Sequence, residues 1–470
     1  MVEAPAGAFA IFAGPFPLQV RPAGGILLQS RSLSSRSTTP PVAGTVLPPL
    51  SLVVLFRCTF CGLQAALLEA ILSGGRGRMG PGIRTASVPV TSSMNTRSQL
   101  IPQVLRAAFG ALLAVVCLAI TPSPAPAGED PFPWRAQIGL STLYDDNILR
   151  YSDKYLGRFA WGEDEGRFHI ETTDDLVFHT FLRLERSLAP LGDYPLTLAT
   201  RVDFWNFSRN TIKNWWAFSL SARQELPEQF SMLAQYNYLP EFYVRHYSDD
   251  DWVRMIGLVP ERFQRFSYAR DEVRLTARRT LFQSTGAAIS YSLVRYYNNQ
   301  HFTEYDSRNI VWEFGLSHPL LSTLRVNAGY MFTTSDAVAV DEPGETPATA
   351  DDADGSYDED AYSAGFTWRL PRLLGLTTRI SMAGEYSRRF YTTLHFAQVD
   401  PQHAGREDLE YMATIEWNIR FDDHWELVVG YTWWQRDSRT AATENEPLLS
   451  DEKDYRKHQL ELGVTYDLDF

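Results

Sequence analysis

The chain has 470 residues and a formal net charge of −13 at pH 7, but its composition changes sharply along its length. All 12 Trp and 22 Tyr lie from Trp134 onward, and the residues from 128 onward hold 34 basic and 54 acidic side chains. Such an acidic region argues against nucleic acid as a partner, because the phosphate backbone attracts Lys and Arg. All three Cys precede residue 128, so this region has neither disulfides nor thiolate chemistry.

Residues 1–93 contain no Lys, Asp, Asn, His, Tyr or Trp. Scattered Pro, Gly and Ser interrupt the apolar stretches, so no folded domain is expected there. Our hypothesis is that residues 1–93 are a non-native, disordered extension upstream of the true start of translation.

Residues 94–127 have the features of a secretory signal peptide. Met94 is followed by two arginines, then by an apolar run over residues 107–120, and then by Ala125-Pro126-Ala127. A basic segment, an apolar segment and a small-x-small cleavage site are typical of such peptides. A transmembrane helix is the alternative, but about 14 apolar residues are too few to cross about 30 Å of hydrocarbon. The mature region is therefore expected to span residues 128–470.

From Trp134 onward, apolar and polar residues alternate with a period of two, which predicts strands with one apolar and one polar face. The last segment is the clearest, with Leu460, Leu462 and Val464 on one face and Gln459, Glu461 and Gly463 on the other. We predict strands at 134–142, 172–186, 195–206, 214–225, 229–240, 265–281, 286–298, 309–317, 322–334, 359–370, 375–390, 408–421, 424–436 and 456–470.

Short and long connections alternate between these strands. About fourteen long strands, short turns at one end and long loops at the other are typical of a bacterial outer-membrane barrel. A soluble β-sandwich also alternates, but its strands are shorter. Trp425 and Trp433 share an apolar face eight residues apart, close to the spacing of two aromatic girdles. The predicted fold is therefore an all-β, antiparallel transmembrane barrel with short periplasmic turns and long extracellular loops.

The last strand ends in Tyr466, Leu468 and Phe470. An alternating terminal strand with a final Phe resembles the recognition signal of outer-membrane barrels. This resemblance implies the barrel-assembly machinery as a partner, outer-membrane lipid as the surroundings and the outer membrane of a Gram-negative cell as the location.

If the apolar face contacts lipid, the polar face lines the lumen. We infer twelve basic and twelve acidic residues on that face. The candidate lumen-lining residues are Arg183, Arg201, Asp203, Arg223, Glu225, Arg274, Arg325, Arg379, Glu385, Glu416, Arg420 and Glu426. A balanced lumen favours neither an anion nor a cation pore. Each of these charges could belong to a structural ion pair across strands or line a hydrated channel. Both remain open because a fourteen-stranded barrel is intermediate in size between barrels whose side chains fill the interior and barrels with an aqueous pore.

An outer-membrane hydrolase is the third interpretation of the sequence. His179 is the His expected in mid-strand, and its parity places it inside the barrel. His246, beside Asp249, Asp250 and Asp251 in a predicted long loop, is the candidate cluster for an outer-membrane hydrolase. A plain acidic loop explains it as well. We expect no enzyme activity, no cofactor and no metal site, since neither a phosphate loop nor metal-spaced His residues are found.

Tyr144-Asp145-Asp146-Asn147 follows the first predicted strand. It resembles a sequence of porin-like barrels linked to exopolysaccharide export, which implies a saccharide as a further partner. The sequence therefore predicts a porin-like channel for small hydrophilic solutes or saccharides. The alternative is a plugged barrel that acts as a structural or surface-interaction protein through its acidic loops.

Overall fold

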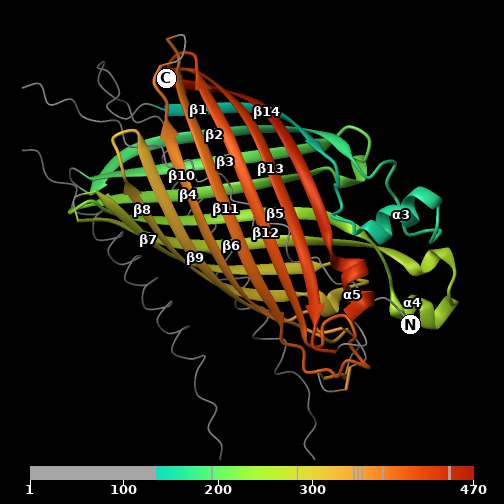
Figure 1. Cartoon of the computed structure of the whole chain (residues 1–470). Coiled ribbons are helices and arrows are strands. Elements are labelled where there is room, and N and C mark those ends of the chain that lie inside the picture. The colour runs from blue at the N-terminus through green and yellow to red at the C-terminus, as the bar shows by residue number, and fades with distance from the viewer. Residues whose placement is uncertain are drawn as a thin grey trace, which may run out of the picture. The chain divides into compact units, whose positions relative to one another are not determined.

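The computed structural model describes residues 134–469, except 192–193, 283, 342–343, 347–348, 351–352, 373–374 and 443–445. The predicted extension, the signal peptide and Phe470 lie outside the described residues. Fourteen antiparallel strands form a closed barrel in which each strand pairs with its neighbours in sequence, and β1 closes the ring against β14 (Figure 1). Closure leaves no unpaired sheet edge, as a barrel in a bilayer requires.

All fourteen predicted strands are confirmed. Their bounds are β1 Trp134–Asp145, β2 Asp175–Leu191, β3 Tyr194–Phe207, β4 Trp215–Leu226, β5 Phe230–Ser248, β6 Phe263–Leu281, β7 Thr285–Asn298, β8 Ser307–Pro319, β9 Leu324–Ala337, β10 Tyr357–Arg369, β11 Thr377–Tyr391, β12 Arg406–Arg420, β13 Trp425–Thr440 and β14 Tyr455–Asp469. The largest difference is at β5, which continues eight residues beyond its predicted end. Residues that were expected in a loop thus belong to the wall.

Short helical segments occupy the long loops. They are α3 Asp153–Trp161, α4 Asp250–Ile256, α5 Glu446–Lys453, and the 3₁₀ turns η2 Thr211–Lys213, η3 Pro260–Arg262 and η4 Thr303–Tyr305. Figure 1 shows α3, α4 and α5 at the same end of the barrel. The tight turns lie at the other end, where Glu228 and Gln229 adopt the left-handed conformation that a short hairpin requires. No helix among these residues is long and apolar enough to cross a membrane.

The outer wall is apolar and exposed. Large side chains that point outward include Ile138, Leu140, Phe178, Leu182, Phe204, Trp216, Trp312, Phe314, Trp368, Trp417, Trp425, Leu460 and Leu462. A continuous exposed apolar wall of this size indicates contact with lipid. The chain is therefore a transmembrane β-barrel of the outer-membrane type, and the polar face of every strand points inward.

Candidate functional site

The barrel interior contains two regions, which we name by the end that they face. The turn-side half lies toward the short turns and includes Arg183, Arg420 and Glu426. The loop-side half lies toward the long loops and includes Arg406 and Asp408. The candidate lumen residues of the sequence analysis lie in the turn-side half or near the middle of the strands.

Charged residues of the turn-side half form two kinds of ion pair. Some pairs lie along one strand, as Arg183 with Glu185 (2.7 Å) in β2 and Arg201 with Asp203 (2.6 Å) in β3. Others bridge an intervening strand: Arg274 in β6 contacts Glu313 in β8, Arg379 contacts Glu426 (3.4 Å), and Arg420 contacts Asp467 (3.6 Å). The interior is thus crosslinked both along and across strands. The alternation of the sequence suggested ion pairs between neighbouring strands alone, and that arrangement does not describe the interior.

The remaining candidates have weaker contacts. Arg325 donates a hydrogen bond to the hydroxyl of Ser317 (2.9 Å). Arg223 and Glu225 both lie within electrostatic range of Arg278. Two candidates lie among other acids: Glu385 is near Glu359, Glu410 and Glu313, whereas Glu416 is near Glu461 and Arg379. Several of these side chains are partly exposed, so the turn-side half is polar and accessible to water.

Ion pairs in the loop-side half are buried. The Arg406 guanidinium donates two hydrogen bonds to Asp408 (2.7 and 2.6 Å), and the two side chains are 0% and 3% exposed. Arg436 lies 3.9 Å from the same carboxylate, and Arg389 pairs with Glu359 at 2.5 Å. A charge removed from water in this way is tolerated only when it is paired and hydrogen-bonded. These pairs are therefore well suited to fix the loop-side half in one arrangement.

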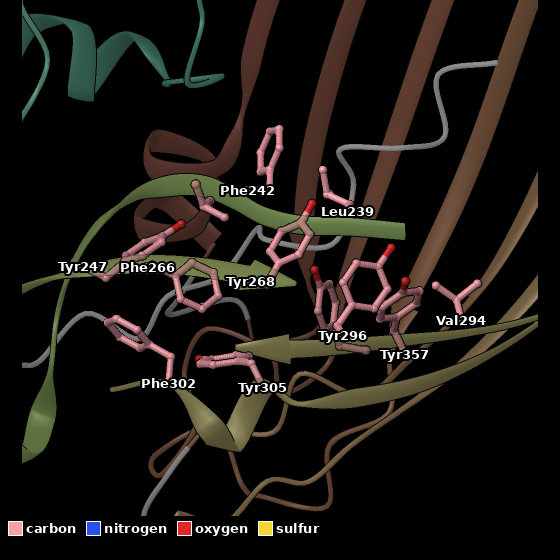
Figure 2. Packing of buried hydrophobic residues seen from close by; sticks show 12 residues of the cluster. Leu239, Phe242, Tyr247, Phe266, Tyr268, Val294, Tyr296, Phe302, Tyr305 and Tyr357 are labelled. Carbon is pink, nitrogen blue, oxygen red and sulfur yellow. The ribbon is translucent and has the colours of Figure 1, made fainter. Parts of the chain in front are cut away.

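Aromatic side chains fill the space beside these pairs. Figure 2 shows Phe266 packed near Tyr247, Phe302 and Tyr305, with ring centroids 5.6, 4.8 and 5.9 Å away. Phe266 and Tyr305 are fully buried. A second group includes Tyr151 from the first long loop, and Trp215 packs against both groups. The long loops thus fold inward and narrow the loop-side half of the barrel.

A series of rings runs from strand to strand along the inner wall, near the loop-side ends of β2 to β6. His179 stacks on Trp205 (4.1 Å), and Trp205 stacks almost parallel on Trp215 (5.1 Å, 12°). The series continues through Phe242 to Tyr268. Both Trp rings are only partly buried, in contrast to Tyr268. Partly exposed aromatic side chains therefore lie where the interior narrows.

The Tyr144–Asn147 segment has a structural role that its sequence did not reveal. Tyr144 and Asp145 still belong to β1, so the segment does not follow the strand as predicted. Asp146 accepts a hydrogen bond from the main chain of His458 (2.7 Å). The Asn147 amide donates to the carbonyls of Tyr151 (2.8 Å) and Arg456 (3.1 Å). The segment fastens the first long loop to β14.

The candidate cluster at His246 is not assembled as expected. His246 lies within β5, where it stacks on His169 (3.6 Å) and shares a hydrogen bond with Tyr243 (2.8 Å). Asp249 instead pairs with His301 (2.8 Å). The prediction that His246 lies in a loop was wrong because β5 extends to Ser248. His246 and Asp249 are close in the sequence, but they bind different partners.

His179 does point inward, and it joins a different polar network. Its Nε2 lies 2.8 Å from Asp203, and its Nδ1 lies 3.4 Å from the hydroxyl of Ser141. These three residue types also form nucleophilic triads. Here Arg201 holds Asp203 through three hydrogen bonds. Ser141 lies in mid-strand, where main-chain N–H groups are used in the barrel ladder and not available as oxyanion donors. We interpret the network as a structural link between β1, β2 and β3.

The candidate lumen-lining residues do not include Arg150, Lys213, Arg245 and Lys457, which are cations of the loop-side half. Arg150, Lys213 and Arg245 lie in segments that were expected to be loops, whereas Lys457 occupies the polar face of the last predicted strand. The alternation of the last strand could have identified Lys457, because odd-numbered residues form its polar face. Nothing in the local sequence indicates that the other three point into the barrel. No group of three or more potential metal ligands occurs among the described residues.

No family model and no curated protein matches the chain. Several solved structures are similar to it. A bacterial polysaccharide outer membrane secretin is 10% identical, with 71% of this chain and 98% of that chain covered and a TM-score of 0.36. The outer membrane channel DcaP of Acinetobacter baumannii is 13% identical (73% and 99% covered, TM-score 0.39). An anion-selective porin from Comamonas acidovorans is 7% identical (72% and 99% covered, TM-score 0.35).

Proposed function

We propose that the protein is a porin-like channel for small hydrophilic solutes or saccharides. The observation that carries this proposal is the turn-side half of the interior. Its wall bears Arg and Glu side chains from strands all around the barrel, and several remain partly exposed, as Arg183 and Arg420 at 41%. A fourteen-stranded barrel with a polar lining of this kind accommodates water.

The aromatic series supports saccharides as the solute class. The rings of Trp205 and Trp215 are nearly parallel, and both side chains are partly exposed. Flat apolar rings of this kind pack against the C–H faces of sugar rings, while nearby polar groups such as Asp203 can accept hydrogen bonds from hydroxyls. The exposed parts of the pair therefore offer a contact for a sugar at the loop-side end of the interior.

The buried loop-side half favours a second function, a plugged barrel that acts as a structural or surface-interaction protein. Its aromatic cluster and its buried ion pairs leave the inward-folded loops well packed. In that case the acidic loops would bind the partner. Under either function, we propose that Tyr466, Leu468 and Phe470 are recognised by the barrel-assembly machinery.

Single-channel conductance separates these two functions. The protein, purified from outer membranes, is inserted into a planar bilayer, and neutral oligosaccharides are added to one side. Steady current that the oligosaccharide reduces supports the saccharide channel, and Trp215→Ala should weaken this block. Trp216→Ala, an outward-facing neighbour, is the matched control. A folded protein that carries no current would contradict the channel and support the plugged barrel.

A further inference from the structure

The loop-side half contains two buried cations whose described contacts include no carboxylate. Lys213, in η2, is 4% exposed. Its ammonium donates a hydrogen bond to the carbonyl of Tyr243 (2.9 Å) and lies 4.5 Å from the centroid of the Phe242 ring. An ammonium has three donors. One carbonyl and a ring face therefore leave it poorly compensated.

Arg245 is the second of these cations. It is 8% exposed, and its Nη2 donates to the carbonyl of Leu149 (2.5 Å), in the first long loop. The guanidinium lies 4.7 Å from the centroid of the Tyr151 ring. Its Nε is buried and has no hydrogen-bond partner among the described residues. Buried donors of native proteins are nearly always paired, so an orphaned charged donor needs an explanation.

Two further cations lie close to this pair. Lys457 and Arg150 lie 5.4 and 6.0 Å from the centroid of the Trp434 ring. Asp145 binds Lys457 (2.6 Å). Burial, and then repulsion from Lys457, lowers the pKa of Lys213 well below its ordinary value. Four cations from the first loop, the β3–β4 connection, β5 and β14 thus gather around Asp145, which forms its ion pair with Lys457.

We propose that Lys213 and Arg245 form a binding site for an anion with carboxylate, sulfate or phosphate oxygens. Such a ligand supplies acceptors to the ammonium and to the unpaired Nε, and charge-assisted hydrogen bonds of this kind are the strong ones. The guanidinium suits oxyanions in particular, because its donors form a planar fork. Since Arg245 also holds the carbonyl of Leu149, a bound anion would stabilise the docked position of the first loop.

A purely structural explanation makes the opposite prediction for stability. If Lys213 serves to hold the Tyr243 carbonyl, then Lys213→Met should unfold at a lower temperature. If the site is short of an anion, the same change replaces an uncompensated buried charge by an apolar side chain of similar length. Lys213→Met should then unfold at a higher temperature in buffers without oxyanions.

The binding test uses the full chain purified in non-ionic detergent, at constant ionic strength with chloride as the counterion. Sulfate, inorganic phosphate and galacturonate are titrated separately by calorimetry. We expect saturable binding, weakened at least about tenfold in Lys213→Met and in Arg245→Gln. Arg209→Gln is the matched control, because this exposed arginine lies in the same connection as Lys213 and should leave affinity unchanged.

Each outcome decides something about the site. Tighter binding of galacturonate assigns the site to the carboxylate of a sugar acid, whereas sulfate and phosphate alone assign it to free inorganic oxyanions. Absence of saturable binding for all three ligands would overturn the proposal. Equal affinities of the wild type and the two variants would also overturn it. None of these results depends on conductance, so the site stands or fails separately from the channel.

Discussion

The two halves of the interior contain the same residue types in different surroundings. In the loop-side half, Arg406 and Asp408 form a pair with side chains 0% and 3% exposed, whereas Arg420 and Asp467 in the turn-side half are 41% and 18% exposed. Water screens the second pair but not the first. The comparison shows that the contribution of an Arg–Asp pair in this barrel depends on its depth, not on its residues. Rigidity is thus concentrated in the loop-side half.

Removal of one charge from each half should give the largest contrast. Asp408→Asn leaves the buried Arg406 guanidinium without its counter-ion and should lower the free energy of unfolding by about 3–5 kcal/mol. Asp467→Asn, the matched change in the turn-side half, should lower it by about 0–1 kcal/mol. Urea unfolding in detergent micelles, followed by tryptophan fluorescence, measures both. Similar losses for the two variants would refute the contrast between the halves.

The attachment of the first loop provides a more local test. Asn147→Ala removes the amide that binds Tyr151 and Arg456, and three hydrogen bonds are lost. We expect a cost of about 1–3 kcal/mol, felt mainly as opening of the loop. Limited proteolysis between residues 146 and 174 should become faster. Asn327→Ala, which removes an exposed amide in the turn-side half, should leave the rate of cleavage unchanged. An unchanged rate in the Asn147 variant would contradict the attachment of the first loop through Asn147.

If current flows, the loop-side half should limit it. Tyr268→Ala removes a buried ring from the narrowed region, so single-channel conductance should rise severalfold. Glu426→Gln changes one partly exposed group in the turn-side half and should alter conductance much less. A larger effect of the Glu426 variant would place the narrowest point at the other end of the barrel.

The smallest expected effect concerns pH. Asp454, which lies between α5 and β14, has its pKa raised from 3.8 to about 6. Burial is the main cause, and the nearby carboxylate of Asp437 adds to it, whereas a hydrogen bond from the main chain of Ser438 lowers the pKa. A raised folded pKa means that the folded state binds the proton more tightly. Its favourable contribution is full below 3.8 and is lost as pH rises through 6. Asp454→Asn should flatten this slope in unfolding temperatures measured from pH 4 to 7.

Much of the barrel could be predicted because alternation is a local property. Side chains of a strand point alternately to opposite faces, so a run such as Leu460, Leu462 and Val464 identifies both a strand and its lipid-facing side. The inward position of His179 followed from the same parity. Strand ends were less predictable. β5 continues through Tyr247 because ladder pairing with β6 persists there, a tertiary contact with no local signal.

The sequence by itself therefore determined the strand count, the antiparallel barrel and the composition of its two faces, since a period of two needs only neighbouring residues. Only the tertiary structure decided the depth of each charge and the identity of its partner. Arg245 meets the carbonyl of Leu149 across 96 positions, and Asp145 meets Lys457 through the closure of β1 on β14. Such contacts depend on how the long loops fold inward and on how the ring closes, and both are set by packing between segments far apart in the chain.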